Sequence, residues 1–95
     1  MILNISVTDL LKLNNPNIID IRSIENYNSN HIPGAKNISY NDLIIRPEKY
    51  LNKSDNYYIY CKQGQTSKGL CQILQRQGYR AYNVIGGYEA WILNG

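Results

Sequence analysis

The sequence predicts an α/β fold with a largely parallel sheet and helices on both faces of that sheet. Short apolar segments typical of buried strands alternate along the chain with segments that have helical spacing or helix-capping residues. The chain has 95 residues and shows no internal repeat, low-complexity tract or linker, which indicates one small domain over residues 1–95. Its hydrophobic content of 43% is divided into separated clusters, as a domain that folds alone requires.

The predicted strands cover residues 2–5, 18–21, 36–39, 57–60 and 81–85, and the predicted helices cover residues 7–13, 23–27, 40–51, 66–77 and 88–93. Ser6 is a suitable N-cap for the first helix, and Asp9 three residues later completes a box-like start. Leu10, Leu11 and Leu13 are expected to form the apolar face of this helix.

Breaks between these elements follow from proline and glycine. Pro47 splits the segment 40–51 into two short helical pieces, and Gly78 fits the position just after the longest helix.

Asp20 and Cys61 each lie near the carboxyl end of a predicted strand. Because ligands of open parallel sheets bind outside the carboxyl ends of strands, these two residues mark the expected site.

Composition excludes several classes of protein. The net charge is +3, but the basic residues are scattered and form no stripe for nucleic acid. No apolar run approaches the ~20 residues of a membrane span, and the N-terminus lacks the pattern of a secretory signal. Two cysteines ten positions apart make neither a secreted disulfide framework nor a zinc site. We therefore expect a cytoplasmic protein that binds neither nucleic acid nor membrane.

The segment from Tyr57 to Ser67 organises the rest of the chain. It predicts a strand, then Cys61, then a polar loop containing Gly64, then the start of a helix. Successive backbone N–H groups of such a loop can form a nest for an anion, and the helix dipole adds positive potential. These influences, together with the charge of Lys62, lower the pKa of a thiol and generate a nucleophilic thiolate without a general base.

An anion cradle around a cysteine sulfur suits three reactions: phosphate ester cleavage, arsenate reduction and sulfur transfer. In sulfur transfer the cysteine would carry an extra sulfur as a persulfide. The alternative interpretation is that Cys61 is an unreactive buried residue at a strand end. The coincidence of strand end, glycine-bearing loop and helix start favours the functional interpretation.

The residues resemble the rhodanese family of sulfurtransferases over nearly the whole chain. Four motifs in the family's order carry the resemblance: Ile19–Arg22, Tyr27 with His31–Ile38, Cys61–Ser67, and Gly78–Tyr79 with Gly86–Trp91. The glycine that usually precedes the histidine is Asn30 here. The resemblance implies a three-layer α/β/α rhodanese-like fold, with five mainly parallel strands in the order 3-2-4-5-1.

The resemblance also implies a function. Cys61 would be the catalytic residue and would accept sulfane sulfur from a donor such as thiosulfate, then pass it to cyanide, a thiol or a protein. The expected substrate-binding residues are those of the loop: Lys62, Gln63, Gly64, Gln65, Thr66 and Ser67. No metal or organic cofactor is expected. The partners expected are a small sulfur donor and acceptor, with a protein donor or acceptor as an alternative, and the chain is expected to be a monomer or weak dimer.

Two loop positions depart from related patterns. Many single-domain members have Arg where this chain has Thr66, so a second hypothesis is a sulfur carrier or interaction module with weak or no thiosulfate activity. Cysteine phosphatases need Arg at the position of Ser67 to hold phosphate in a bidentate manner, which makes a phosphatase or arsenate reductase a poorer candidate.

The remaining candidates are assigned supporting or structural roles. Asp20 is expected to orient the loop by accepting its N–H groups or to cap its own strand, and Arg22 to pair with Glu25. His31 is expected to be structural. Cys71 is assigned to the core, with a resolving thiol for Cys61 as the alternative, and Trp91 is assigned as a lid over the core from the last helix.

Overall fold

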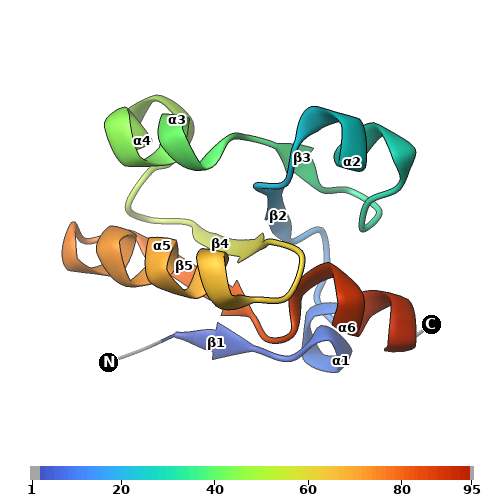
Figure 1. Cartoon of the computed structure of the whole chain (residues 1–95). Coiled ribbons are helices and arrows are strands. Elements are labelled where there is room, and N and C mark those ends of the chain that lie inside the picture. The colour runs from blue at the N-terminus through green and yellow to red at the C-terminus, as the bar shows by residue number, and fades with distance from the viewer. Residues whose placement is uncertain (1–2, 95) are drawn as a thin grey trace.

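The computed structural model describes residues 3–94, which form a five-stranded parallel sheet between two groups of helices (Figure 1). The strands are β1 (Asn4–Ile5), β2 (Asn17–Asp20), β3 (Lys36–Asn37), β4 (Asn56–Tyr60) and β5 (Arg80–Val84). Their order across the sheet is β1-β5-β4-β2-β3, and every neighbouring pair is parallel. Read from the β3 edge, this is the expected order 3-2-4-5-1, so the predicted fold class and topology are confirmed.

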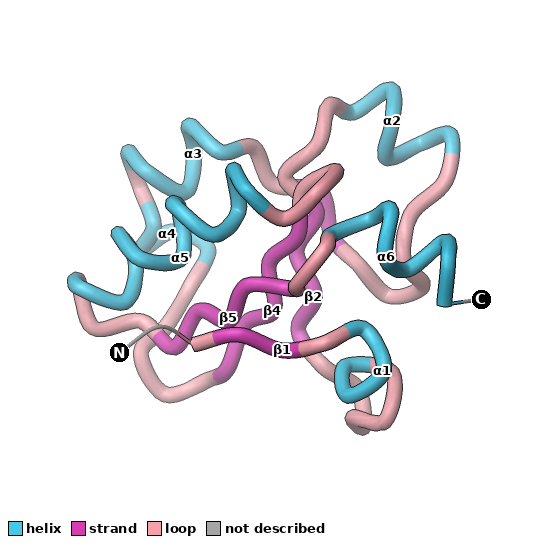
Figure 2. Tube along the Cα trace, turned by 60° about the horizontal axis from the view of Figure 1, so that its bottom comes forward, coloured by secondary structure: helices cyan, strands magenta, loops and turns pink. Residues whose placement is uncertain are grey.

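The helices are α1 (Val7–Leu10), α2 (Ile24–Ser29), α3 (Tyr40–Ile45), α4 (Pro47–Tyr50), α5 (Gln65–Arg76) and α6 (Gly87–Asn94). Helices α3, α4 and α5 gather on one side of the sheet, and α1 and α6 lie together on the other (Figures 1 and 2). Tyr57 and Ile59 of β4 point to the α5 side, whereas Tyr58 and Tyr60 point to the α1–α6 side. The alternation of side chains along a strand thus gives the sheet a hydrophobic core on each face.

Serine caps begin three of the short helices. Ser6, Ser23 and Ser39 each accept a hydrogen bond from the backbone N–H three residues later, which satisfies a donor that the helix leaves free. Pro47 occupies the first turn of α4 and separates it from α3, as predicted. Gly78 has φ +95°, a left-handed conformation that glycine adopts easily, and it follows the end of α5 as predicted.

Two details of the prediction needed correction, and one lies outside the described residues. Helix α1 ends at Leu10, so Leu11 and Leu13 are exposed rather than part of an apolar face, while Val7 and Leu10 are buried. Helix α5 begins at Gln65, one residue earlier than expected. The expected first strand includes Ile2, which lies outside the described residues. Among residues 3–94, no helix is both long and apolar enough to cross a membrane.

Register places the important side chains at one end of the sheet. Asp20 at the end of β2 is paired with Tyr60 at the end of β4, and Ile59 is paired with Asn83 of β5. Cys61 follows Tyr60 directly, so the loop that leaves β4 begins between β2, which ends in Asp20, and β5, which carries Asn83 just before its last residue. A central strand of this kind holds the start of the loop rigidly.

Candidate active site

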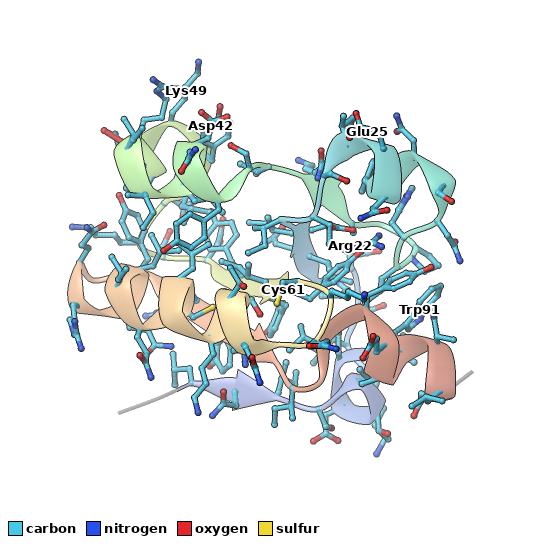
Figure 3. All side chains as sticks on the ribbon, in the orientation of Figure 1. Arg22, Glu25, Asp42, Lys49, Cys61 and Trp91 are labelled. Carbon is cyan, nitrogen blue, oxygen red and sulfur yellow. The ribbon has the colours of Figure 1, made fainter. Side chains whose placement is uncertain are left out.

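Cys61 lies where β4 passes into the loop before α5 (Figure 3). Its side chain is 8% exposed, so the sulfur is nearly enclosed. Gly64 is the N-cap of α5 and has φ +91°, a left-handed conformation that turns the chain sharply back over the sulfur. A Cβ atom at this position would lie 2.9 Å from the backbone nitrogen of Gly86, so the loop also needs glycine here for space.

Three hydrogen-bond partners surround the Cys61 sulfur. The Gly64 N–H donates to Sγ at 3.1 Å and the Ser67 N–H donates at 3.3 Å. The Ser67 hydroxyl lies 3.3 Å from Sγ. Burial raises the pKa of the Cys61 thiol, but the Ser67 hydroxyl and the N–H groups of Ser67, Gly64 and Gln63 lower it by more, so the pKa lies below its ordinary value.

The first turn of α6 holds the loop in this conformation. The Tyr88 N–H donates to the carbonyl of Cys61 at 2.8 Å, and the Glu89 N–H donates to the carbonyl of Lys62 at 3.0 Å. A helix leaves its first N–H groups without internal partners, and here the loop carbonyls use two of them. With these carbonyls turned toward α6, the following N–H groups of the loop are free to turn toward the sulfur.

Gly87 makes this contact between α6 and the loop possible. It has φ +59°, and a Cβ atom there would collide with the Cys61 carbonyl oxygen and lie 2.9 Å from Gly64 N and Lys62 O. From the sequence, Gly86 and Gly87 are expected to form a turn and belong to the motif Gly86–Trp91, with no contact to the Cys61 loop assigned to them. The adjacent pair of glycines just before a helix was the signal that another backbone approaches closely at this point.

A buried charged cluster supports the end of β4 from the side. The Asp20 carboxylate accepts the Arg22 N–H at 2.8 Å, the Arg22 guanidinium at 2.8 Å and the Tyr60 hydroxyl at 2.6 Å. Asp20 is fully buried. Burial and the hydrogen bond to Asp20 raise the pKa of Tyr60, so this hydroxyl stays protonated and keeps donating.

This cluster corrects two expectations. Asp20 accepts no N–H group of the Cys61 loop and instead positions Tyr60, the residue just before Cys61. Arg22 pairs with Asp20 rather than with Glu25. Figure 3 shows the Arg22 side chain between β2 and α6, where its guanidinium lies 3.8 Å from the centre of the Tyr88 ring. The contact is a cation–π interaction that ties β2 to the helix holding the loop.

The Ser67 hydroxyl also reaches β5, where it donates to Asn83 Oδ1 at 2.6 Å. Ser67 is fully buried and Asn83 is 4% exposed. The sequence allows Thr66 and Ser67 either to supply hydroxyl donors or to cap the helix; Ser67 supplies its hydroxyl to the site, and the N-cap of α5 is Gly64. Asn83 was not recognised from the sequence, although a polar residue inside an otherwise apolar strand was a usable signal.

The other loop side chains face solvent. Lys62, Gln63, Gln65 and Thr66 are exposed around the buried sulfur, so a ligand that reaches Cys61 would pass them. His31 stacks on Tyr27 and hydrogen-bonds the Tyr27 carbonyl at 2.8 Å, which is the structural role expected of it. Among residues 3–94, no three His, Cys, Asp or Glu side chains lie close enough to hold a metal ion.

A cavity of about 410 Å³ lies elsewhere, at the β3 edge of the sheet. It is lined by residues that include Asn17, Lys36, Tyr50 and Tyr57, and by none of the residues of the Cys61 loop. Asn17 begins β2 and Cys61 follows the end of β4, so the cavity and the thiol belong to different parts of the sheet. The thiol is the better candidate for chemistry, because its hydrogen bonds favour a reactive charged form.

Together the fold and the loop define an α/β protein with a buried cysteine thiol whose anion is stabilised by backbone N–H groups. A family model, the Rhodanese-like domain, matches residues 6–94. The chain therefore belongs to the rhodanese-like family of sulfurtransferases, and the resemblance of its four motifs to that family is confirmed.

Individual relatives agree with this assignment. Thiosulfate sulfurtransferase GlpE of Coxiella burnetii is 33% identical over 84 residues, which are 87% of this chain and 78% of GlpE. YrkF of Bacillus subtilis, named as a candidate sulfur carrier protein, is 36% identical over 76 residues, but this chain covers only 40% of its length. The crystal structure of a rhodanese-like domain protein from Staphylococcus aureus superposes with a TM-score of 0.81 at 33% identity, covering 95% of this chain and 91% of that one.

Proposed function

We propose that the protein is a thiosulfate sulfurtransferase that carries sulfur as a persulfide on Cys61. The observation that supports this most directly is the set of donors at Sγ: two backbone N–H groups and one hydroxyl within 3.3 Å. They lower the pKa of the thiol, which increases its thiolate fraction, and they suit a second, outer sulfur that also carries negative charge. The similarity to GlpE supports thiosulfate as the donor.

The reaction balances without a cofactor. The Cys61 thiolate attacks the outer sulfur of thiosulfate, the S–S bond of thiosulfate breaks, and sulfite leaves with the electron pair. The terminal sulfur of the resulting persulfide carries the negative charge, which N–H groups of the loop are placed to stabilise. An acceptor such as cyanide then attacks that sulfur, the bond to Cys61 breaks, and the thiolate returns.

A second candidate function is a sulfur carrier that is loaded by a protein. It is favoured by Thr66, because the loop has no guanidinium to bind a dianion and Lys62 is its one formal cation. The guanidinium of Arg22 is engaged by Asp20 and by the Asn30 carbonyl. Phosphate ester cleavage is disfavoured, since Ser67 stands where a phosphatase has its phosphate-binding Arg.

Intact mass spectrometry tests the proposal. Treatment with thiosulfate should add the mass of one sulfur atom, cyanide should remove it, and Cys61→Ser should abolish the addition, whereas Cys71→Ala should keep it. Loading by a cysteine desulfurase with no loading by thiosulfate would favour the carrier. Equal loading of Cys61→Ser and the unaltered protein would refute the role of Cys61 in both functions.

A further inference from the structure

Three side chains form a hydrogen-bond chain that leads from the reactive sulfur into the sheet. Cys61 Sγ lies 3.3 Å from Ser67 Oγ, and Ser67 Oγ lies 2.6 Å from Asn83 Oδ1. Cys61, Ser67 and Asn83 are all buried, so water competes little for these contacts. The three side chains are therefore held in place. Which group donates and which accepts along this hydrogen-bond chain depends on where the hydrogens lie.

The Ser67 hydroxyl has one hydrogen and donates to one neighbour at a time. While it donates to Asn83 Oδ1, it can only accept from Cys61, which requires the neutral thiol. A thiolate has no hydrogen, so the hydroxyl must then donate to Sγ. Its oxygen would face Asn83 Oδ1 as a second acceptor at 2.6 Å, which is a repulsive contact.

Asn83 can relieve this repulsion because its amide has a donor at the other end. A half-turn of the amide exchanges Oδ1 and Nδ2 and leaves the shape of the side chain unchanged. Within residues 3–94, the bond from Ser67 is the one hydrogen bond found for the Asn83 side chain, so no second partner holds the amide in place.

We propose that Asn83 is a positioning residue whose amide sets the direction of this chain, with its carbonyl toward Ser67 when Cys61 is a thiol and its NH2 group toward Ser67 when Cys61 is an anion. In the anionic state Asn83 donates to Ser67 and Ser67 donates to Sγ, after the thiol proton has passed to solvent. The electron pair that attacks the donor stays on the sulfur. Because each hydrogen bond in a chain polarises the next, Asn83 stabilises the charge without touching the sulfur.

Other ionisable groups near the chain are accounted for separately. Cys71 of α5 stays neutral because burial and the nearby Cys61 raise its pKa to about 12. The remaining groups on the surrounding elements are Lys62 in the loop, Lys68 and Arg76 in α5, Asp20 and Arg22 at the end of β2, Tyr57, Tyr58 and Tyr60 in β4, Arg80 and Tyr82 in β5, and Tyr88 and Glu89 in α6. Asp20, Arg22 and Tyr60 are bonded to one another, and none of these groups is a member of the Cys61–Ser67–Asn83 chain.

The test is the pH profile of the alkylation of Cys61 by iodoacetamide, followed by mass spectrometry. Asn83→Asp replaces the amide by a group that only accepts when ionised, so the chain is held in the thiol direction. The pKa of Cys61 should rise by at least one unit, and the rate at neutral pH should fall at least about tenfold. Asn28→Asp, which adds the same charge at an exposed position, should leave the profile unchanged.

A second variant distinguishes an Asn83 amide that changes its orientation from one that keeps a single orientation. Asn83→Leu removes the carbonyl and the NH2 group together, so both charge states of Cys61 lose a partner and the pKa should change by less than about half a unit. A rise of one unit or more would mean that the amide only donates. A clear fall would mean that it only accepts. Either result would overturn the proposal, even where Asn83→Asp fails to fold.

A double-mutant cycle shows whether Asn83 acts through the hydroxyl. In a Ser67→Ala background, Asn83→Asp should lose most of its effect on the pKa of Cys61. An equal effect in both backgrounds would mean that the added charge acts directly through space, and the proposal would fail. The inference rests on Cys61 being the reactive thiol of the proposed function, but alkylation needs no sulfur donor, so failure of either is seen independently.

Discussion

The two cysteines of this protein lie ten residues apart in the sequence and are both buried, yet the structure moves their pKa values in opposite directions. Cys61 is 8% exposed and its thiol pKa is lowered, whereas Cys71 of α5 is fully enclosed in the core and its pKa is raised to about 12. Burial acts against ionisation at both positions. The difference lies in the donors, because two N–H groups and a hydroxyl reach the sulfur of Cys61.

This comparison shows that the position of a thiol relative to α5 decides whether its pKa is lowered or raised. Cys61 precedes the helix and meets N–H groups that the first turn leaves without partners. Cys71 lies in the middle of the helix, where the backbone groups are paired with one another and the neighbours are apolar. The start of this helix therefore favours ionisation of the thiol before it, and its buried middle opposes ionisation of the thiol it carries.

The largest expected effect is a difference in reactivity between the two thiols. With iodoacetamide at neutral pH, Cys61 should react at least about a thousandfold faster than Cys71, since their pKa values differ by three units or more. Peptide mapping after partial alkylation measures both rates in one sample. Denaturation should remove the difference, and comparable rates in the folded protein would break the comparison.

A smaller effect is expected from Gly87→Ala, which disturbs the donors of Cys61 without changing the cysteine. The added methyl group collides with the Cys61 carbonyl, so the loop must shift and the sulfur loses part of its N–H contacts. We expect the alkylation rate of Cys61 to fall by about tenfold, with about 1–3 kcal/mol lost in the free energy of unfolding.

Gly34→Ala is the matched control for this substitution. Gly34 also has a positive φ, +87°, but a Cβ atom there has nothing within 4 Å. It should lose stability through backbone strain alone and keep the alkylation rate. If both variants lose reactivity equally, the close approach of α6 is not what shapes the loop.

The smallest effect concerns stability and pH. Because the Cys71 pKa is raised in the folded state, its favourable contribution is complete below about pH 8.5, the pKa of an unfolded Cys, and is lost as pH rises toward 12. Above about pH 9 this thiol should lower the free energy of unfolding by up to about 1.4 kcal/mol per pH unit. In Cys71→Ala, the free energy of unfolding measured with urea should fall with pH less steeply by that amount.

Cys61 provides the opposite sign as a control. Its lowered pKa contributes stability that is present above about pH 8.5 and is lost as pH falls through the folded-state value. The unaltered protein should therefore lose free energy of unfolding as Cys61 is protonated, and Cys61→Ser should not show this loss. If the free energy of unfolding of Cys71→Ala changes with pH as it does in the unaltered protein, the Cys71 thiol ionises as readily in the folded state as in the unfolded state.

Much of the fold was predictable because local patterns specify it. The apolar segments, the Ser6 cap of α1, the break at Pro47 and the glycine after α5 all act within a few residues of their own position. The incorrect predictions concern where helices begin and end, because conformations that compete there differ little in free energy. Leu11 and Leu13 fit a helical face, but α1 ends at Leu10.

The site was predictable only in part. That Cys61, Gly64 and Ser67 lie together could be predicted because the loop is contiguous in the sequence. The contribution of Asn83, the α6 N–H groups and Gly87 was missed, because these residues lie more than fifteen positions away and meet the loop only after β5 has paired with β4. Asp20 was found, but its partners were assigned wrongly.

The sequence by itself determined the alternation of strands and helices, the order of the motifs and the cysteine at a strand end, since each depends on neighbouring residues. Only the tertiary structure decided which N–H groups reach the sulfur, what holds the loop from behind and why Cys71 stays inert. These depend on distances of about 3 Å between segments remote in the chain, and hydrogen bonds weaken steeply beyond that range. The pattern of residues places the thiol, and the packing of β5 and α6 against its loop determines its charge.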